Sequence, residues 1–236
     1  MTIPQKKLIL YSCLLVGTTF GLFLLFPFIL GPKWGYVSGF VLYWVCALFF
    51  STRIDGFNLS GLKRKYSAAS SWPFLIISAV AFIPVFGVFF VSFLPNASLL
   101  TITSGILVIL FSICNGLVEE FFWRGLYLDQ FRENAVVSLI VSPLIFGAYH
   151  IALWFIKGIT YQGGFVALVG GAYFMGLIWA WVTRKTGSIL AVTIAHVMVN
   201  IFALPVYSYR MVFNSPNTIA VSTGRGVINI SWNKVT

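Results

Sequence analysis

Long apolar runs dominate the sequence and leave few residues that could form a water-facing surface. Hydrophobic residues make up 59% of the 236 residues, and charged residues make up only 8%. A soluble domain carries about 25% charged residues, and a disordered chain needs low hydrophobicity, so both classes are excluded. The runs cover residues 8–30, 34–52, 72–94, 100–128, 136–156, 165–183 and 189–204. The sequence therefore predicts an all-α polytopic membrane protein.

The number of spans follows from the length of these runs, because a transmembrane helix needs about 20 apolar residues. We expect seven transmembrane helices, or eight if residues 100–128 hide two segments. The first run has no signal-peptide cleavage site and is too long for a signal-peptide core of about 7–15 residues, so it predicts a retained anchor. Residues 1–204 would form one transmembrane domain with a motif core at 100–204, and residues 205–236 a short extramembranous tail.

Lysine and arginine residues predict the orientation, because cytoplasmic loops carry the excess of positive charge. With the N-terminus inside, the inner segments hold Lys6, Lys7, Arg53, Lys63, Arg64, Lys65, Arg132, Arg184 and Lys185. The outer loops then hold Lys33 and Lys157, and the tail holds Arg210, Arg225 and Lys234. The charge pattern therefore predicts an integral membrane protein with a cytoplasmic N-terminus. We expect the membrane to be the plasma membrane of a prokaryote.

The net charge of +10 is interpreted as loop charge that meets anionic lipid headgroups. Nucleic-acid binding is not expected, because the sequence offers no soluble domain to carry a basic face.

Five ionisable residues lie inside the predicted spans, although the whole chain has only five acids and two histidines. They are Glu119, Glu120, Arg124, His150 and His196. An ionisable group inside a membrane costs about 2.5–3.5 kcal/mol on insertion scales and by default marks a functional interior. Each residue alone could be a structural hydrogen-bond partner, but together they predict a polar intramembrane cavity.

Helical spacing divides these residues into sets. Glu120 and Arg124 are four residues apart, share a helix face and can neutralise each other. Glu119 is rotated about 100° from Glu120, which leaves it free to face another helix. The same four-residue spacing places Phe146 with His150 and His196 with Asn200.

Three motifs in this order resemble the CPBP family of CAAX proteases and bacteriocin-processing membrane proteins, also called Abi proteins. They stand as Glu119-Glu120-x-x-x-Arg124, Phe146-x-x-x-His150 and His196-x-x-x-Asn200. Thr186-Gly187-Ser188, just before the third motif, resembles the usual entry into that family's last motif helix.

The resemblance implies an intramembrane endopeptidase similar to the type II CAAX prenyl endopeptidases. Glu119 would be the general base that activates water, assisted by His150. His196 and Asn200 would form the oxyanion site. Glu120 and Arg124 would support the first motif, and Phe146 would line the pocket. The substrate would be a membrane-associated peptide or protein; in a bacterium, a prenylated CAAX protein is not expected.

The need for a metal stays open at this stage. Glu119, His150 and His196 could form a three-ligand zinc site, although the HExxH helix of zincins is absent. We favour no cofactor, because Glu119 and His150 alone can activate water. A second class of function, a non-catalytic scaffold or bacteriocin-immunity protein of the same family, also stays open. A proton-coupled transporter is the third class of function that we consider. It is ranked last because the sequence has no pair of broken helices that repeats across two halves, as transporters often have.

Overall fold

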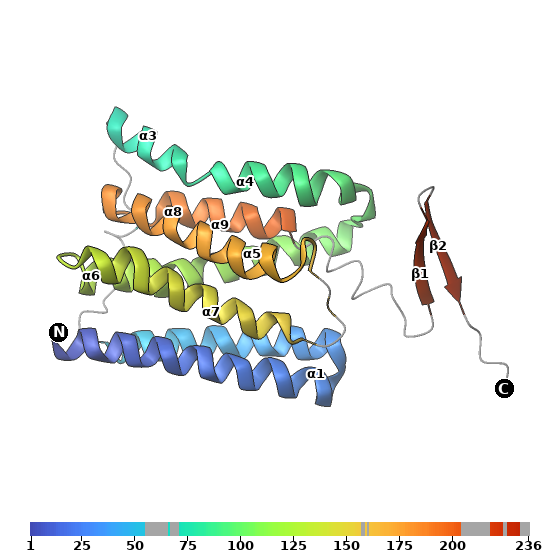
Figure 1. Ribbon diagram of the computed structural model, residues 1–236, viewed down its shortest axis with the longest axis horizontal. Coiled ribbons are helices and arrows are strands. Elements are labelled where there is room, and N and C mark those ends of the chain that lie inside the picture. Colours follow the sequence, from blue (N-terminus) through green and yellow to red (C-terminus); the bar gives the residue numbers. More distant parts are fainter. Residues whose placement is uncertain are drawn as a thin grey trace.

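The computed structural model describes residues 1–54, 66, 71–156, 159, 161–203, 218–223 and 226–231. In the membrane part, the helices run side by side along one direction (Figure 1). Five described helical stretches are long and apolar enough to cross a membrane: Ile3–Thr52, Trp72–Ser98, Ile102–Gln130, Val137–Trp154 and Val166–Thr186. A shorter apolar helix covers Leu190–Ala203. The predicted helical membrane fold is thus confirmed, whereas the number of crossings stays a prediction.

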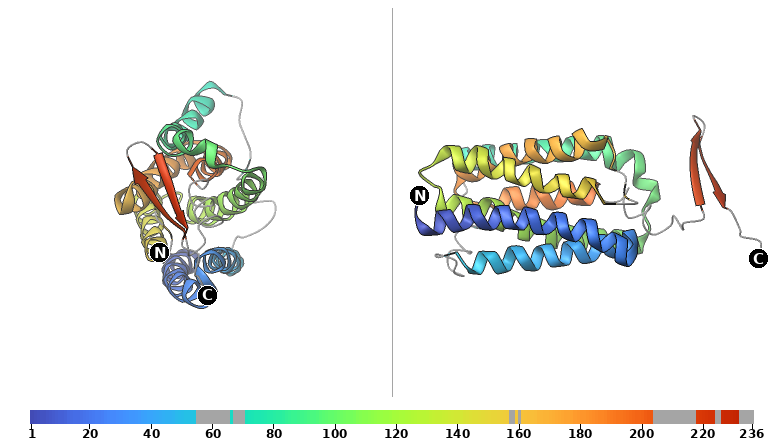
Figure 2. Two further views of the ribbon diagram at one scale, coloured as in Figure 1. Left: turned by 90° about the vertical axis from the view of Figure 1, so that its right-hand side faces the viewer. Right: turned by 60° about the horizontal axis from the view of Figure 1, so that its bottom comes forward.

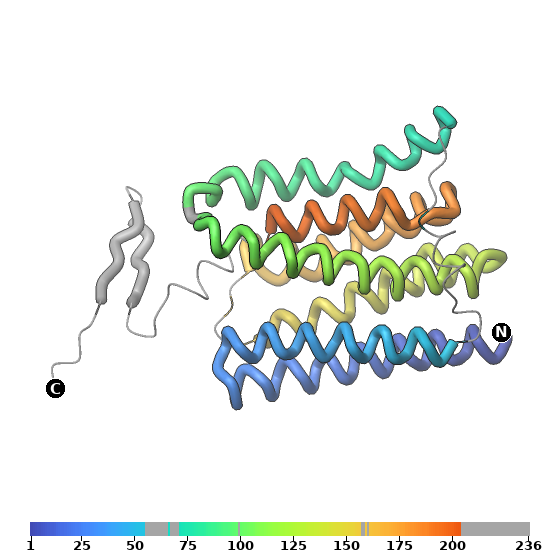
Figure 3. The backbone as a smooth tube through the Cα atoms, turned by 180° about the vertical axis from the view of Figure 1, so that it is seen from behind, coloured from blue at the N-terminus to red at the C-terminus, as the bar shows by residue number. Residues whose placement is uncertain are grey.

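The first two predicted spans are the arms of α1 (Ile3–Thr52), which folds back on itself. Its first turn is stabilised by a capping box, in which Thr2 and Gln5 each hydrogen-bond the other's backbone N–H. The helical backbone breaks at Gly31, whose φ of 78° favours glycine. Tyr11 and Phe50 then stack with ring centroids 5.1 Å apart, and the two arms lie side by side (Figure 3).

The third predicted span is broken into shorter helical pieces. It consists of α3 (Trp72–Val80), α4 (Ile83–Val88), the π-helical turn η1 (Phe89–Phe93) and the 3₁₀ turn η2 (Leu94–Leu99). The break between α3 and α4 comes just before Pro84, which lies in the first turn of α4. A proline lacks the backbone N–H that would continue the preceding helix.

The long fourth run is one continuous helical stretch. It comprises α5 (Ile102–Glu120), the π-helical turn η3 (Phe121–Leu126) and α6 (Tyr127–Gln130). The alternative of an eighth span required two segments here, and the described residues form only one.

The last three predicted spans also form helices. They are η4 (Val137–Val141) with α7 (Ser142–Trp154), η5 (Val166–Gly170) with α8 (Gly171–Thr186), and α9 (Leu190–Ala203). Gly187 ends α8 in the left-handed conformation with a φ of 69°. The Ser188 hydroxyl then accepts a hydrogen bond from the Leu190 backbone at 3.2 Å. The Thr-Gly-Ser sequence thus ends one helix and caps the next.

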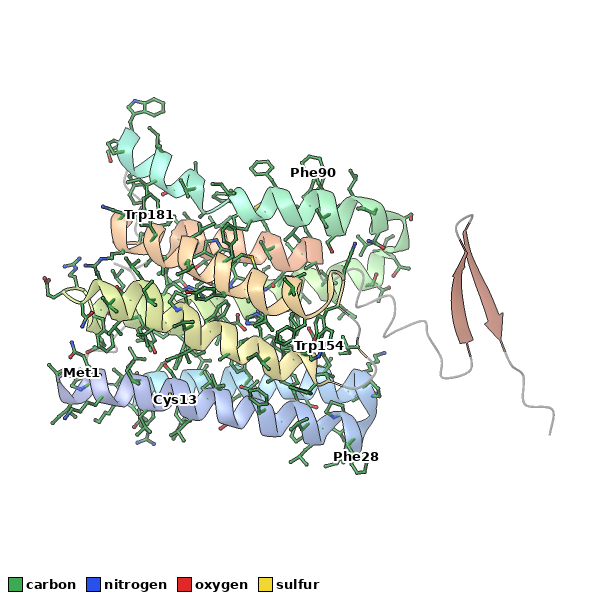
Figure 4. All side chains as sticks on the ribbon, in the orientation of Figure 1. Met1, Cys13, Phe28, Phe90, Trp154 and Trp181 are labelled. Atoms are coloured by element: carbon green, nitrogen blue, oxygen red, sulfur yellow. The ribbon has the colours of Figure 1, made fainter. Side chains whose placement is uncertain are left out.

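The packing order places α9 in the interior of the bundle. It packs against α5 and α4, while α7 packs against both α1 and α8 (Figure 2). Gly116 allows the close approach of α5 to α9, because a Cβ there would lie 2.7 Å from a Val197 methyl group. The outer faces are apolar: Phe28 and Phe90 project away from the bundle and are 80% and 60% exposed (Figure 4). These faces suit contact with lipid.

Two hydrogen bonds join helix ends at one end of the bundle. The Gln5 side chain donates to the Gln130 carbonyl at 2.6 Å, and the Arg184 guanidinium donates to the Arg132 carbonyl at 2.7 Å. The basic residues near these ends therefore gather on one side, as the charge pattern predicts. Seven predicted loop and tail charges lie outside the described residues: Lys63, Arg64, Lys65, Lys157, Arg210, Arg225 and Lys234.

The described part of the tail contains two strands that the all-α prediction did not include. β1 (Thr218–Thr223) pairs with β2 (Gly226–Ser231) in antiparallel register, with Val221 opposite Ile228. Valine, isoleucine and threonine are enriched in strands, so the alternating pattern of β2 carried this signal. The boundary between the membrane domain and the tail stays a prediction.

Candidate active site

The first motif lies at the junction of α5 and η3. Glu119, Glu120 and Arg124 are 1%, 0% and 2% exposed. Arg124 Nη1 donates to Glu120 Oε1 at 3.1 Å, as expected for residues four apart. The helix switches to the wider π-helical winding directly after Glu120. Such π-helical turns are frequent at functional sites, and the sequence analysis did not predict this one.

His196 of α9 joins both glutamates. Its Nδ1 lies 2.6 Å from Glu120 Oε1 and its Nε2 lies 3.5 Å from Glu119 Oε2. Because a carboxylate only accepts hydrogen bonds, His196 carries a hydrogen on Nδ1 when it binds Glu120. Sequence spacing predicted only Arg124 as the partner of Glu120, so the structure adds His196 as a second one.

His150 of α7 is half-buried and has no direct hydrogen bond to the glutamates. Its Nδ1 lies 2.9 Å from the Phe146 carbonyl one turn earlier. A carbonyl accepts, so the hydrogen of a neutral His150 is on Nδ1, and Nε2 remains as an acceptor. Its ring packs in a T-shaped arrangement against Phe146 and Tyr149, with ring centroids 4.6 Å and 4.7 Å apart.

The Phe146 ring connects the three motifs. The Arg124 guanidinium lies over its face at 4.2 Å. The His150 ring contacts it at 4.6 Å, and the His196 ring at 6.3 Å, between centroids. The resemblance implied that Phe146 lines the pocket, and the structure places it among side chains of all three motifs.

Aromatic residues outside the motifs complete the cluster. Trp179 of α8 is fully buried and packs on His196 with centroids 4.8 Å apart. Its indole N–H donates to the Ala81 carbonyl at 3.0 Å, which ties α8 to the end of α3. Sequence reasoning missed Trp179, because a tryptophan in a membrane helix carries no signal that separates it from ordinary packing.

Two tyrosines lie beside Glu119 and were also missed. Tyr43 of α1 stacks on Tyr149 of α7 with centroids 4.6 Å apart. Both tyrosines lie near the Glu119 carboxylate, but neither hydroxyl forms a hydrogen bond with it. The Tyr43 hydroxyl accepts from the Trp123 indole at 2.9 Å, whereas the Tyr149 hydroxyl is buried without a described partner. The position of Tyr149, directly before His150, was the one available sequence signal.

Several polar atoms here have no hydrogen-bond partner among the described residues. They include both carboxylate oxygens of Glu119 and the amide nitrogen of Asn200. Asn200 follows His196 by one turn of α9. The cluster therefore contains an acceptor, the Glu119 carboxylate, and a donor, the Asn200 amide, that form no hydrogen bond to a described residue. Such a pair suits binding of a polar group.

The sequence analysis left zinc open, with Glu119, His150 and His196 as candidate ligands. Among the described residues, no group of three or more His, Cys, Asp and Glu side chains could hold a metal ion. Metal dependence stays a prediction. A pocket lies at Arg124, but its described lining does not include Glu119, His150, His196 or Asn200. An open cavity around Glu119 stays a prediction.

Comparison with known families gives one match. Residues 101–202 match the family described as Type II CAAX prenyl endopeptidase Rce1-like. In this segment the chain is similar to the Rce1-like family. The Rce1-like segment covers α5 to α9 and so includes all three motifs, whereas α1, α3 and α4 precede it. The resemblance drawn from the motifs is thereby confirmed.

No curated protein and no solved structure gives a significant match. At family level, this match supports a CAAX-protease-type membrane protein. The apolar helices and the matched segment together support an integral membrane protein.

Proposed function

We propose that this protein is an intramembrane endopeptidase that hydrolyses a peptide bond in a membrane-associated peptide or protein. One observation carries the proposal: of two adjacent buried glutamates, Glu120 is hydrogen-bonded to two side chains, whereas Glu119 forms no hydrogen bond to a described residue. Glu120 binds both Arg124 and His196, while neither oxygen of Glu119 has a hydrogen-bond partner among the described residues. A general base needs accessible lone pairs within reach of the proton that it takes.

Glu119 acts as the general base in this proposal. Its carboxylate takes a proton from water while the water oxygen attacks the carbonyl carbon. A tetrahedral intermediate forms, and the Glu119 carboxylic acid then gives the proton to the leaving nitrogen as the C–N bond breaks. His150 assists by accepting a hydrogen bond from the same water through Nε2, because its Nδ1 is committed to the Phe146 carbonyl.

His196 and Asn200 stabilise the oxyanion of the intermediate. His196 can donate only from Nε2, since Nδ1 binds Glu120. Donation therefore requires hydrogens on both ring nitrogens, and the Glu120 carboxylate that binds Nδ1 provides a partner for such an imidazolium. The Asn200 amide nitrogen is a buried donor that no described residue uses. Donors aimed at developing charge in a dry site are among the strongest contributions to catalysis.

Glu120 and Arg124 hold this arrangement in place. The guanidinium is stacked on Phe146 and bound to Glu120, which in turn fixes the His196 ring. This chain of contacts connects η3, α7 and α9, so the motif helices keep a defined distance. Positioning of this kind matters because a displacement of about 1 Å can cost about 10²-fold in rate.

The test is cleavage by purified protein in nanodiscs. A library of peptides anchored in the bilayer is incubated with wild type and with Glu119→Gln, and products are identified by mass spectrometry. Products that appear with wild type and disappear with Glu119→Gln support the proposal. If no peptide is cleaved and Glu119→Gln keeps the cellular function, the non-catalytic scaffold or immunity role is favoured instead.

A further inference from the structure

One end of the bundle contains a pocket. It lies between the continuous stretch of η3 and α6, the turn η4 and the helix α8. Its polar lining consists of Arg124, Ser138, Thr183 and Arg184, and its apolar lining includes Trp123 and Tyr127. The interior holds about one water-sized group, so a ligand could place a single polar atom inside. None of the described lining residues is acidic.

Arg124 lines this pocket and carries an unused donor. Its Nη1 binds Glu120 at 3.1 Å, whereas Nη2 is buried without a hydrogen-bond partner among the described residues. The faces of the guanidinium are covered by Phe146 and Trp179, which do not replace a hydrogen-bond acceptor. A buried guanidinium N–H without an acceptor is costly, so the missing partner is expected to be an acceptor.

Thr183 brings a second unused donor. A hydroxyl in a helix usually bonds the carbonyl four residues earlier, and Ser12, Thr19 and Ser51 do so here, as does Thr186. Thr183 is 3% exposed, and its hydroxyl has no partner among the described residues. Its hydroxyl is therefore available to a group in the pocket.

Arg184 adds a second positive charge and is held in place. Its Nη1 donates to the Arg132 carbonyl at 2.7 Å and to the Ser138 hydroxyl at 3.3 Å. Two guanidinium groups and a free hydroxyl, with no acidic group in the lining, match the oxygens of an anion such as a phosphate.

The surroundings of the pocket match the headgroup level of a membrane. Beside it, Val136, Ile140 and Trp181 are 64%, 43% and 38% exposed. Trp181 lies near the end of α8, on the side of the bundle where the N-terminus lies (Figure 4). Lys185 follows in the last turn. Apolar side chains, an interfacial tryptophan and basic residues in this order mark the membrane–water boundary.

We propose that this pocket binds a phosphate oxygen of an anionic membrane lipid. The oxygen enters between Arg124 and Thr183, and the rest of the headgroup remains at the mouth beside Arg184. Such a lipid would fix the end of α8 against η3, the turn that follows the two glutamates. The proposal does not depend on the protease activity.

Lipid binding is tested with delipidated protein in detergent by thermal unfolding and native mass spectrometry. Phosphatidylglycerol is titrated, with phosphatidylcholine and inorganic phosphate as parallel ligands. We expect saturable binding of phosphatidylglycerol with a rise in Tm and a much smaller response to the other two. Thr183→Val keeps the volume and removes the hydroxyl, and Arg184→Gln removes the charge. Each should weaken phosphatidylglycerol binding about 10-fold.

Lys185→Gln is the matched control, because Lys185 is exposed in the same helical turn and does not line the pocket. It should bind phosphatidylglycerol as wild type does. Equal binding by wild type and Thr183→Val, or equal weakening by Lys185→Gln and Arg184→Gln, would overturn the proposal in favour of general surface charge. An equal response to inorganic phosphate would overturn the lipid as the source. Displacement of the lipid by a peptide with a free C-terminal carboxylate, but not by its amide, would instead assign the pocket to peptide ends.

Discussion

Glu119 and Glu120 are neighbours in the chain with different surroundings. For this reason we assign Glu119 as the general base and Glu120 as a residue that positions its neighbours. Replacing Glu119 with glutamine keeps the side-chain volume and removes the base. We expect peptide cleavage to fall about 10²–10⁴-fold, with an unchanged unfolding temperature in detergent, because Glu119 makes no hydrogen bond that the fold needs. Cleavage assays and thermal unfolding of the same preparation give both quantities. A fully active Glu119→Gln protein would contradict the assignment.

Arg124→Ala should have the opposite signature. It leaves Glu120 with His196 alone and removes the cation from a buried pair, a loss of about 3–5 kcal/mol in the free energy of unfolding. Denaturation in mixed micelles measures this loss. The double variant Glu120→Gln/Arg124→Ala is the control, because no charge is stranded and part of the stability should return. A stable Arg124→Ala protein would show that the pair does not support the fold.

Tyr149 and Tyr43 offer a matched comparison beside Glu119. The Tyr149 hydroxyl has no described hydrogen-bond partner, so Tyr149→Phe should preserve stability. It also removes a donor near Glu119 and should lower kcat about 10-fold, the size of one hydrogen bond, with little change in KM. The Tyr43 hydroxyl accepts from Trp123, so Tyr43→Phe leaves a buried N–H without an acceptor and should cost about 1–3 kcal/mol. Steady-state kinetics and thermal unfolding separate the two effects. Unchanged kinetics in Tyr149→Phe would place Tyr149 in packing only.

Variants of His150, His196 and Asn200 test whether the activity depends on a metal. In the metal-free proposal, a chelator leaves cleavage unchanged, and Asn200→Ala lowers kcat about 10²–10³-fold as for a lost oxyanion donor. If Glu119, His150 and His196 bind zinc instead, His150→Ala and His196→Ala should each lose metal and activity together. Elemental analysis of active protein tests this, and stoichiometric zinc would refute the metal-free proposal.

Much of this site was predictable from residue types, because an acid or histidine inside an apolar run is rare and stands out. Glu119, Glu120 and Arg124 were identified in this way, as were both histidines. Trp179 and the two tyrosines were not, since aromatic residues are common in this chain and their roles depend on which helices meet. The second partner of Glu120 was missed for the same reason: spacing reports neighbours on one helix and not across two.

At the scale of elements, the spacing between α5 and α9 controls the distance between Glu119 and His196. Gly116 lies one turn before Glu120, and a Cβ there would lie 2.7 Å from a Val197 methyl group and 3.3 Å from the Val197 backbone nitrogen. Gly116→Ala should therefore push α9 away, cost about 1–3 kcal/mol and lower activity about 10²-fold.

Gly105→Ala is the matched control on the same helix, because nothing lies within 4 Å of a Cβ at that position. It should keep full activity and gain up to about 1 kcal/mol from helix propensity. Kinetics and unfolding of both variants make the comparison. Equal activity in the two variants would show that α9 is not positioned by this contact.

Element positions were also predictable to different degrees. The apolar runs predicted where helices lie, because a run of about 20 apolar residues has few other stable forms in lipid. They did not predict that Gly31 joins two arms within one helical element, nor the π-helical turn after Glu120. Both depend on local backbone geometry, to which hydropathy is insensitive.

At the scale of the whole molecule, one end of the bundle carries the basic helix ends. The hydrogen bonds of Gln5 and Arg184 place the start of α1 near the end of α6 and the end of α8 near Arg132. Lys33 lies beside the bend of α1 at Gly31, at the opposite end of the bundle (Figure 1). The excess of positive charge faces the cytoplasm in membrane proteins, so the basic end should be cytoplasmic.

Cysteine accessibility tests this orientation and the number of crossings of α1. In a protein whose three native cysteines are replaced by alanine, Lys33→Cys should react with a membrane-impermeant maleimide in intact cells. Arg132→Cys and Lys6→Cys should react only after the cells are permeabilised. This pattern requires the first arm of α1 to cross, because Lys6 and Lys33 would then be on opposite sides. Labelling of Lys6→Cys in intact cells would reverse the orientation. Labelling of Lys33→Cys and Lys6→Cys from the same side would show that the first arm of α1 does not span the bilayer, in which case the seven-helix prediction fails.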